Sequence, residues 1–178
     1  MKKVIICKFE DLIGEEEAIS VKTMLKIEKL KKEKYTLIVN SKKKIEDILY
    51  YNRDFPFIDF IINDKGYYFY DVKKNKKVIN NKLSMKYINK IYKLYPNTYI
   101  NFVGENGLIK GDMIKDEDIY EINVFSDDIK VDDLSLNIKK NKDKIIITKN
   151  SDILNEIRKK LKIDTLKKIT KGELEKFD

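Results

Sequence analysis

Apolar and polar positions follow two alternating patterns over the first fifty residues of the chain. Residues 3–9 and 35–39 contain short runs of apolar, often β-branched side chains, which are typical of buried strands. The stretch that starts at Val21, and the one that follows Asn40, instead repeat apolar residues every three or four positions, as amphipathic helices do. Strands and helices in strict succession, with short joins, predict a parallel sheet.

Residues that can cap a helix stand before both helical stretches. Ser20 precedes the first stretch, and Asn40 or Ser41 precedes the second. A hydroxyl or amide oxygen at such a position accepts a hydrogen bond from a free backbone N–H group of the first turn. The acidic residues 10–17 interrupt the pattern after the first strand and predict a connection.

The rest of the chain continues with strands and helices in mixed order. The predicted elements are a strand at 57–63, a hairpin of 67–72 and 77–79 around Lys74-Asn75, a helix at 84–94, strands at 99–103, 108–110, 120–125 and 144–148, and a helix at 152–161 capped by Ser151. Residues 164–177 are polar and weakly periodic, so no strand is predicted after residue 161. The sequence therefore divides into 1–83 with strand–helix repeats, 84–148, and a helix with a tail at 149–178 that could return to the first part.

The composition fits a folded domain and excludes several kinds of chemistry. The chain has 178 residues, and none of its apolar runs approaches the roughly 20 residues that span a bilayer. The absence of a basic and apolar leader predicts a cytoplasmic protein. Cys7 is the one cysteine and there is no histidine, which excludes a disulfide framework, an imidazole zinc site and a Ser-His or Cys-His nucleophile.

The net charge of +8 raises the question of nucleic-acid binding. Of the 38 basic residues only Arg53 and Arg158 are arginine, so the guanidinium groups that specific base reading favours are nearly missing. Nucleic acid is therefore not expected as a partner, and most lysines are interpreted as solvated. Residues 67–70 are all aromatic and alternate between two faces of a strand, so an outward pair could serve a homodimer.

Six segments of the chain follow one another in a familiar order: Ile5–Ile13, Ala18–Ser20, Leu37–Lys42, Ile61–Asp71, Leu83-Ser84 and Asp118–Ser126. This order resembles the Cof-type sugar-phosphatase branch of the haloacid dehalogenase (HAD) superfamily. In that branch a strand ending in Asp-x-Asp-Gly-Thr precedes an Ile-Ser helix start, a strand ending in Thr-Gly-Arg, and a hairpin after an Asn-Gly turn. The resemblance implies a HAD-like Rossmannoid α/β fold, with helices on both faces of a parallel sheet and a small α/β cap-like insertion.

The residues at the catalytic positions of that pattern have changed. In the family the first aspartate attacks phosphorus and ligates Mg²⁺, and the second aspartate protonates the leaving oxygen. Here Lys8 stands at the first position and Glu10 at the second. The resemblance therefore implies that the nucleophile is replaced, whereas an acid remains at the acid/base position. The ammonium of Lys8 could pair with a neighbouring carboxylate or extend to water.

Other positions of the family pattern give the candidate phosphate ligands. Asn40, Ser41 and Lys42 stand where the phosphate-binding Thr-Gly-Arg would be. Lys149 loosely matches the lysine that stabilises the attacking carboxylate.

A late metal ligand is the remaining element of the pattern. In the family a strand leads into Gly-Asp, with another acid about four residues later. Gly111-Asp112 with Asp116 fits this spacing, which makes Asp112 and Asp116 candidate metal ligands, and a solvated turn is the competing interpretation.

Three functions remain open from the sequence. The first is a catalytically impaired HAD-like protein, with a retained binding or regulatory role and no cofactor. The second is an active Mg²⁺-dependent phosphohydrolase whose site is re-routed through other carboxylates, namely Glu10, Asp11, Asp112 and Asp116. The third is a basic binding module for anionic metabolites or nucleic acid, in which Lys8, Asn40, Ser41 and Lys42 would hold a small phosphorylated or anionic ligand.

Overall fold

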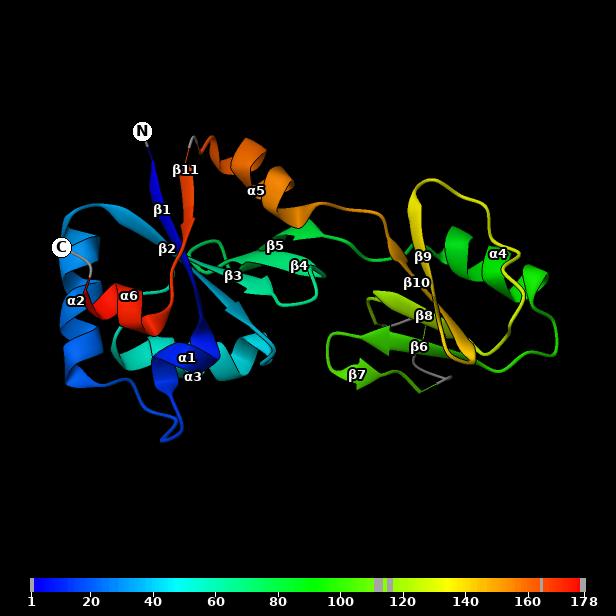
Figure 1. The fold of residues 1–178 in the computed structure, drawn as a ribbon, viewed down its shortest axis with the longest axis horizontal. Coiled ribbons are helices and arrows are strands. Elements are labelled where there is room, and N and C mark those ends of the chain that lie inside the picture. The colour runs from blue at the N-terminus through cyan, green and yellow to red at the C-terminus, as the bar shows by residue number, and fades with distance from the viewer. Residues whose placement is uncertain (1, 111–113, 115–116, 164, 177–178) are drawn as a thin grey trace. The chain divides into compact units, whose positions relative to one another are not determined.

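The computed structural model describes the chain except for residues 1, 111–113, 115–116, 164 and 177–178. The chain separates into two compact units: Met1–Asn80 with Asp152–Asp178 form unit 1, and Asn81–Ser151 form unit 2 (Figure 1). Unit 2 is thus inserted into the sequence of unit 1. Its first and last residues lie close together, as shown by the hydrogen bond that Asn81 Nδ2 donates to Ser151 Oγ at 3.1 Å.

Unit 1 is built on a six-stranded sheet. Its strands are β1 (Lys3–Lys8), β2 (Tyr35–Ser41), β3 (Phe60–Asn63), β4 (Tyr68–Asp71), β5 (Lys76–Asn80) and β11 (Thr165–Lys168). They lie in the order β11-β1-β2-β3-β4-β5; the first four strands of this order run parallel, and β4 and β5 follow through antiparallel pairing. The predicted parallel sheet and its hairpin are confirmed.

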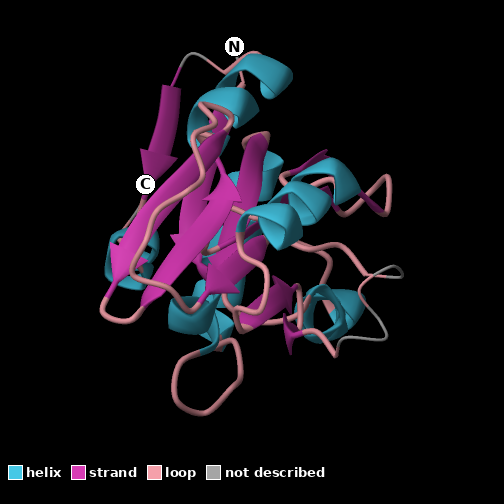
Figure 2. Cartoon of the chain, turned by 90° about the vertical axis from the view of Figure 1, so that its right-hand side faces the viewer, coloured by secondary structure: helices cyan, strands magenta, loops and turns pink. Residues whose placement is uncertain are grey.

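Five helices accompany this sheet among the described residues of unit 1: α1 (Phe9–Ile13), α2 (Val21–Lys32), α3 (Ile45–Asp54), α5 (Ile153–Leu161) and α6 (Lys171–Glu175). Ile157 of α5 packs in one core cluster with Val4 and Ile6 of β1. Because successive strand residues point to opposite faces, Ile5 faces the other side. Connections between parallel strands of one sheet are right-handed as a rule, which places α2, between β1 and β2, and α3, between β2 and β3, on that other side. Figure 2 shows helices in cyan beside the magenta strands.

The start of α3 differs from the predicted one. Asn40 and Ser41 do not cap this helix; they are the last two residues of β2. Their backbones pair with Ile62 and Asn63 of β3, so the sheet keeps them extended. The residue before α3 is Lys44, whose side chain caps nothing.

At the other two predicted helix starts, the cap residue is either the predicted one or its immediate neighbour. Ser20 caps α2 as predicted, and its Oγ accepts a hydrogen bond from the Thr23 N–H group at 3.2 Å. Before α5 the cap is Asp152 rather than Ser151, because the Asp152 carboxylate accepts from the Asn155 N–H group.

Three segments contain elements that the sequence pattern did not predict. The acidic connection begins with the short helix α1, directly after β1. The polar tail contains β11 and α6, which corrects the expectation that no strand follows residue 161. Unit 2 contains one further strand, β9 (Leu136–Asn141).

The described residues of unit 2 form one helix against an antiparallel sheet. The helix is α4 (Met85–Leu94), and the strands besides β9 are β6 (Ile100–Gly104), β7 (Gly107–Leu108), β8 (Glu121–Val124) and β10 (Lys144–Lys149). The strand order is β7-β6-β8-β10-β9. Ile88 and Ile91 of α4 pack against Phe102, Ile122 and Ile147 in the core of this unit.

The C-terminal helix α6 is docked on α2 (Figure 1). Leu174 is 0% exposed, and the Glu175 carboxylate lies 3.5 Å from the Lys22 ammonium. The Thr23 hydroxyl also donates to Glu175 at 3.5 Å. The tail is therefore part of the core of unit 1. Among the described residues, no helix has both the length and the apolar character needed to cross a membrane.

Leu174→Ala should lower the free energy of unfolding by about 2–5 kcal/mol, because a buried leucine loses its contacts and leaves a cavity. Urea unfolding followed by circular dichroism measures this change. Leu25→Ala is the control, since Leu25 is 61% exposed on α2, and its effect should stay within about 0.5 kcal/mol. Equal effects of the two substitutions would contradict the docking of α6.

Candidate functional site

The carboxyl ends of β11, β1 and β2 meet at one edge of the sheet of unit 1. One neighbour of β1 in the sheet is β2, the next strand along the chain. The other neighbour is β11, the last strand of the chain. Ligands of open α/β sheets bind at such a point, outside the carboxyl ends of the strands. A cavity of about 320 Å³ lies there, and its polar lining consists of Lys8, Asp11, Asn40, Lys168, Thr170 and Glu173.

Lys8 is the last residue of β1 and pairs in register with Asn40 of β2. Its side chain is exposed, and it forms no ion pair with any residue that the structure describes. Of the two expectations for this ammonium, the geometry favours the one in which it extends to water. Lys8 therefore presents its positive charge to the cavity rather than to a protein carboxylate.

Lys8, Asn40 and Lys168 lie on the same face of the sheet. Ile6 packs under α5, and Lys8 lies two residues further along the same strand. Lys168 is the register partner of Ile6 on β11. Asn40 Oδ1 is buried and has no hydrogen-bond partner among the described residues. Three neighbouring strands thus bring two ammonium groups and one amide to the cavity.

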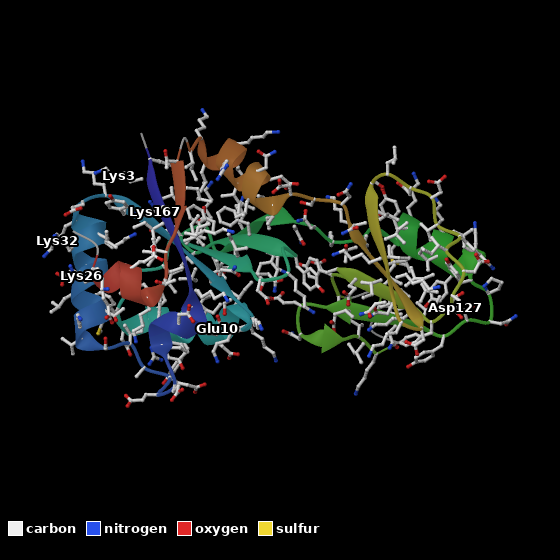
Figure 3. All side chains as sticks on the ribbon, in the orientation of Figure 1. Lys3, Glu10, Lys26, Lys32, Asp127 and Lys167 are labelled. Atoms are coloured by element: carbon white, nitrogen blue, oxygen red, sulfur yellow. The ribbon has the colours of Figure 1, made fainter. Side chains whose placement is uncertain are left out.

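Glu10 lies in the first turn of α1, at the end of β1 (Figure 3). Its Oε1 atom accepts hydrogen bonds from Ser41 Oγ at 2.6 Å and from the Lys42 backbone N–H group at 2.9 Å. The sequence assigned Glu10 to proton transfer, and Ser41 and Lys42 to phosphate binding. The structure brings these three residues together through the Glu10 carboxylate.

The pKa of Glu10 lies below its ordinary value of 4.5. Burial is the largest single influence and raises this pKa, because the charged form loses hydration. The hydrogen bonds from the Ser41 hydroxyl and from backbone N–H groups, together with the Lys43 ammonium, outweigh it and lower the pKa. At neutral pH Glu10 is therefore an ionised carboxylate.

Cys7 also borders the cavity, as a buried side chain of β1. Burial, and to a lesser extent the negative charge of Asp11, raises the pKa of its thiol to about 12. The thiol is therefore protonated at neutral pH, and Cys7 serves as a small apolar core residue rather than as a nucleophile.

Residues after β11 complete this edge, and the sequence pattern did not identify them. Thr170 Oγ1 accepts a hydrogen bond from the Glu173 N–H group at 3.2 Å and so caps α6. Lys171 lines a second, more open hollow together with Glu10 and Asp11. The spacing from Thr170 to Glu173 is that of a capping box, which is the local signal that could have indicated a helix start here.

The other predicted site residues are not among the described residues of unit 1. Lys149 is the exposed last residue of β10 in unit 2, so it is not among the residues that unit 1 brings to this edge. Asp112 and Asp116 lie outside the described residues.

The comparison with family models covers nearly the whole chain. Residues 12–177 match the model for haloacid dehalogenase-like hydrolases. The chain belongs to this family. The match begins at Leu12, the last residue of the segment 8–12 that stands in the place of the first HAD motif.

Solved structures of HAD proteins share the fold of this chain. A HAD superfamily phosphatase from Bacteroides thetaiotaomicron aligns with 94% of this chain and 76% of its own, at a TM-score of 0.60 and 9% identity. A protein from Thermotoga maritima aligns over 91% and 76%, at a TM-score of 0.57 and 16% identity. A sugar phosphatase of HAD subclass IIB aligns over 92% and 77%, at a TM-score of 0.54 and 12% identity. These likenesses confirm the Cof-type HAD fold. A search of curated proteins gives no match.

HAD phosphatases use Mg²⁺, which requires several oxygen ligands in octahedral geometry. At the edge of this HAD-like chain, the described acids are Glu10, already bound by Ser41 and Lys42, and the exposed Asp11 and Glu173. Within the described ranges, no group of three Asp, Glu, Cys or His side chains is placed to hold a metal ion. The described residues of this edge therefore do not fit Mg²⁺.

Glu10→Gln should lower the free energy of unfolding at neutral pH. A carboxyl group whose pKa is lowered by folding stabilises the fold above its ordinary value of 4.5, and this stabilisation is lost as the pH falls through the lowered pKa. The difference between wild type and variant should therefore shrink below pH 4.5. Urea titrations from neutral pH to about pH 2.5 measure it.

Glu16→Gln is the control for this titration, because Glu16 is exposed in the turn after α1. Its difference from wild type should be small at every pH. A Glu10→Gln difference that stays constant over the whole range would contradict the role of the ionised carboxylate.

Proposed function

We propose that this HAD-like protein lacks phosphatase activity and binds a small anionic ligand, such as a phosphorylated metabolite, at the carboxyl edge of β1. The observation that carries the proposal is the place of Lys8. It is the last residue of β1, borders the cavity and forms no ion pair with a described residue. In the family pattern this is the place from which a carboxylate attacks phosphorus.

The replacement of a carboxylate by an ammonium removes two functions at once. A protonated amine has no electron pair for attack on phosphorus, so no aspartyl-phosphate can form. The same positive charge repels a divalent cation instead of ligating it.

The state of Glu10 also argues against acid catalysis. A general acid must hold a proton near neutral pH, and enzymes raise the pKa of a carboxyl group for this purpose. The pKa of Glu10 is lowered instead, and its Oε1 atom accepts two hydrogen bonds. Glu10 is therefore suited to accepting hydrogen bonds rather than to protonating a leaving group.

The strand on the other side of β1 leads into no aspartate. After β11 the chain continues Ile169-Thr170-Lys171-Gly172-Glu173, whereas the family pattern has Gly-Asp at the end of a late strand. Thr170 borders the cavity, and Lys171 borders the neighbouring hollow. This side of the edge thus adds the ammonium groups of Lys168 and Lys171 and a single carboxylate, that of Glu173, where the family pattern has an aspartate.

The cavity itself supports the anion. Lys8 and Lys168 supply two ammonium groups from adjacent strands, and Asn40 lies on the strand opposite Lys8. Ammonium groups bind phosphate and carboxylate as point charges with three donors each. The lining also includes the carboxylates of Asp11 and Glu173 and the side chain of Thr170, which can bind the hydroxyl groups of a sugar phosphate. The cavity volume of about 320 Å³ admits a ligand of that size.

The purified protein with Mg²⁺ should not hydrolyse p-nitrophenyl phosphate or sugar phosphates above the uncatalysed background. Phosphate release over time measures this. Turnover that Glu10→Gln abolishes, and that Glu28→Gln on α2 leaves unchanged, would contradict the proposal. That outcome would favour the Mg²⁺-dependent hydrolase re-routed through Glu10 and Asp11.

Glucose 6-phosphate at millimolar concentration should raise the melting temperature of the wild-type protein, because a ligand that binds only the native state stabilises it. Lys8→Glu and Lys168→Glu should each weaken this binding by about tenfold or more, since each removes a charge-assisted contact and adds repulsion. Lys73→Glu is the matched control, because Lys73 is exposed in the turn between β4 and β5. The absence of any stabilisation by sugar phosphates, or an equal loss in all three variants, would contradict the anion site.

A further inference from the structure

Two hydrogen-bond donors at the end of β2 converge on a single oxygen atom. The Ser41 hydroxyl and the Lys42 backbone N–H group both bind Glu10 Oε1, at 2.6 and 2.9 Å. The Lys43 N–H group donates to Ser41 Oγ at 3.0 Å, so the hydroxyl accepts there and directs its own hydrogen at Glu10. Ser41 is only 1% exposed, which fixes this donor in the fold.

These two donors bind a negatively charged oxygen, but they do not distinguish the oxygen of a carboxylate from that of a phosphate. A hydroxyl and a main-chain N–H group on one oxygen satisfy a phosphate oxygen as well as a carboxylate oxygen. We propose that Ser41 and Lys42 form an oxyanion subsite whose resident occupant is the Glu10 carboxylate, and that Glu10 thereby excludes free phosphate from it.

The tether of Glu10 explains why it prevails over free anions. Glu10 belongs to α1, which begins immediately after β1, and β1 pairs with β2 along its whole length. A group tethered this closely competes at an effective concentration of about a millimolar or more. The ionised state of Glu10 at neutral pH strengthens both hydrogen bonds. Free phosphate must therefore displace a charged group that is always present.

The inference deepens the proposed function and rests on it in one respect: Glu10 can remain in the subsite only if it has no proton to deliver to a leaving group. The subsite is separate from the proposed ligand cavity. Successive residues of β2 point to opposite faces, so Ser41 lies on the face opposite Asn40. An anion held by Lys8 and Lys168 can therefore bind while Glu10 keeps its place.

The test is a titration of the full chain with inorganic phosphate, in which calorimetry measures the binding. Glu10→Ala should bind phosphate at least about tenfold more tightly than wild type, because the subsite becomes vacant; tenfold corresponds to about 1.4 kcal/mol. Adding Ser41→Ala to this variant should remove the gain. Glu15→Ala is the matched control, because Glu15 is an exposed acid just after the end of α1 and takes no part in the hydrogen bonds of Ser41 and Lys42 to Glu10.

An equal gain in phosphate affinity for Glu10→Ala and Glu15→Ala would overturn the inference, because the gain would then reflect net charge alone. The absence of a gain in Glu10→Ala, or a gain that survives Ser41→Ala, would also overturn it. If Glu10→Ala does not fold, Glu10→Gln is the second variant: it keeps the size of the side chain, and its neutral amide should compete less well with phosphate. Failure of the proposed function would appear separately, as phosphatase turnover or as a Lys8→Glu variant with unchanged binding of glucose 6-phosphate.

Discussion

Backbone hydrogen bonding along both edges of β1 is the constraint on which unit 1 depends. One edge of β1 pairs with β2, and the other pairs with β11, which comes from the far end of the chain. The return of the chain to β1 brings residues from three distant segments to one edge of the sheet. The candidate site therefore exists only when this long-range pairing has formed, and its geometry is held by an internal strand of the sheet rather than by a loop.

The position of the nucleophile carries a positive charge at this edge, the reverse of the HAD pattern, whereas carboxylates remain at Glu10, Asp11 and Glu173. A phosphatase of this family brings carboxylates, a divalent cation and a phosphate group together. Here Lys8 and Lys168 supply fixed positive charge, and Glu10 supplies a fixed negative charge to the donors at the end of β2. Under the proposed function, this edge binds an anion, and side chains take the places of the cation and the nucleophile.

The sequence predicted those elements whose signal is local. The hairpin of β4 and β5, the helix α2 with its Ser20 cap and the helix α4 were all predicted from periodicity and turn residues. The strand β11 was missed because it contains one apolar residue, Leu166, and is a strand through its pairing with β1. The predicted strand at 57–63 is shortened to β3 for a similar reason: Asn52 Oδ1 accepts hydrogen bonds from the N–H groups of Phe57 and Ile58.

The candidate site likewise contains residues that a local sequence signal could place and residues whose position depends on long-range pairing. The order of strands was sufficient to place Lys8, Glu10 and Asn40 at one edge, because the carboxyl ends of parallel strands meet there. Lys168 and Thr170 could not be placed without knowledge of β11. The bond between Glu10 and Ser41 depends on the pairing of β1 with β2 and on the start of α1 directly after β1, and no spacing in the sequence encodes it.

The hydrogen bond between Asn81 and Ser151 has a consequence for how such a chain can change over time. Because the insertion leaves and re-enters at neighbouring points, its length has little effect on the entropy of closing the sheet around it. A module bounded in this way can be shortened, enlarged or exchanged while the sheet of unit 1 keeps its register. The insertion and the scaffold can then evolve as separate parts of one polypeptide.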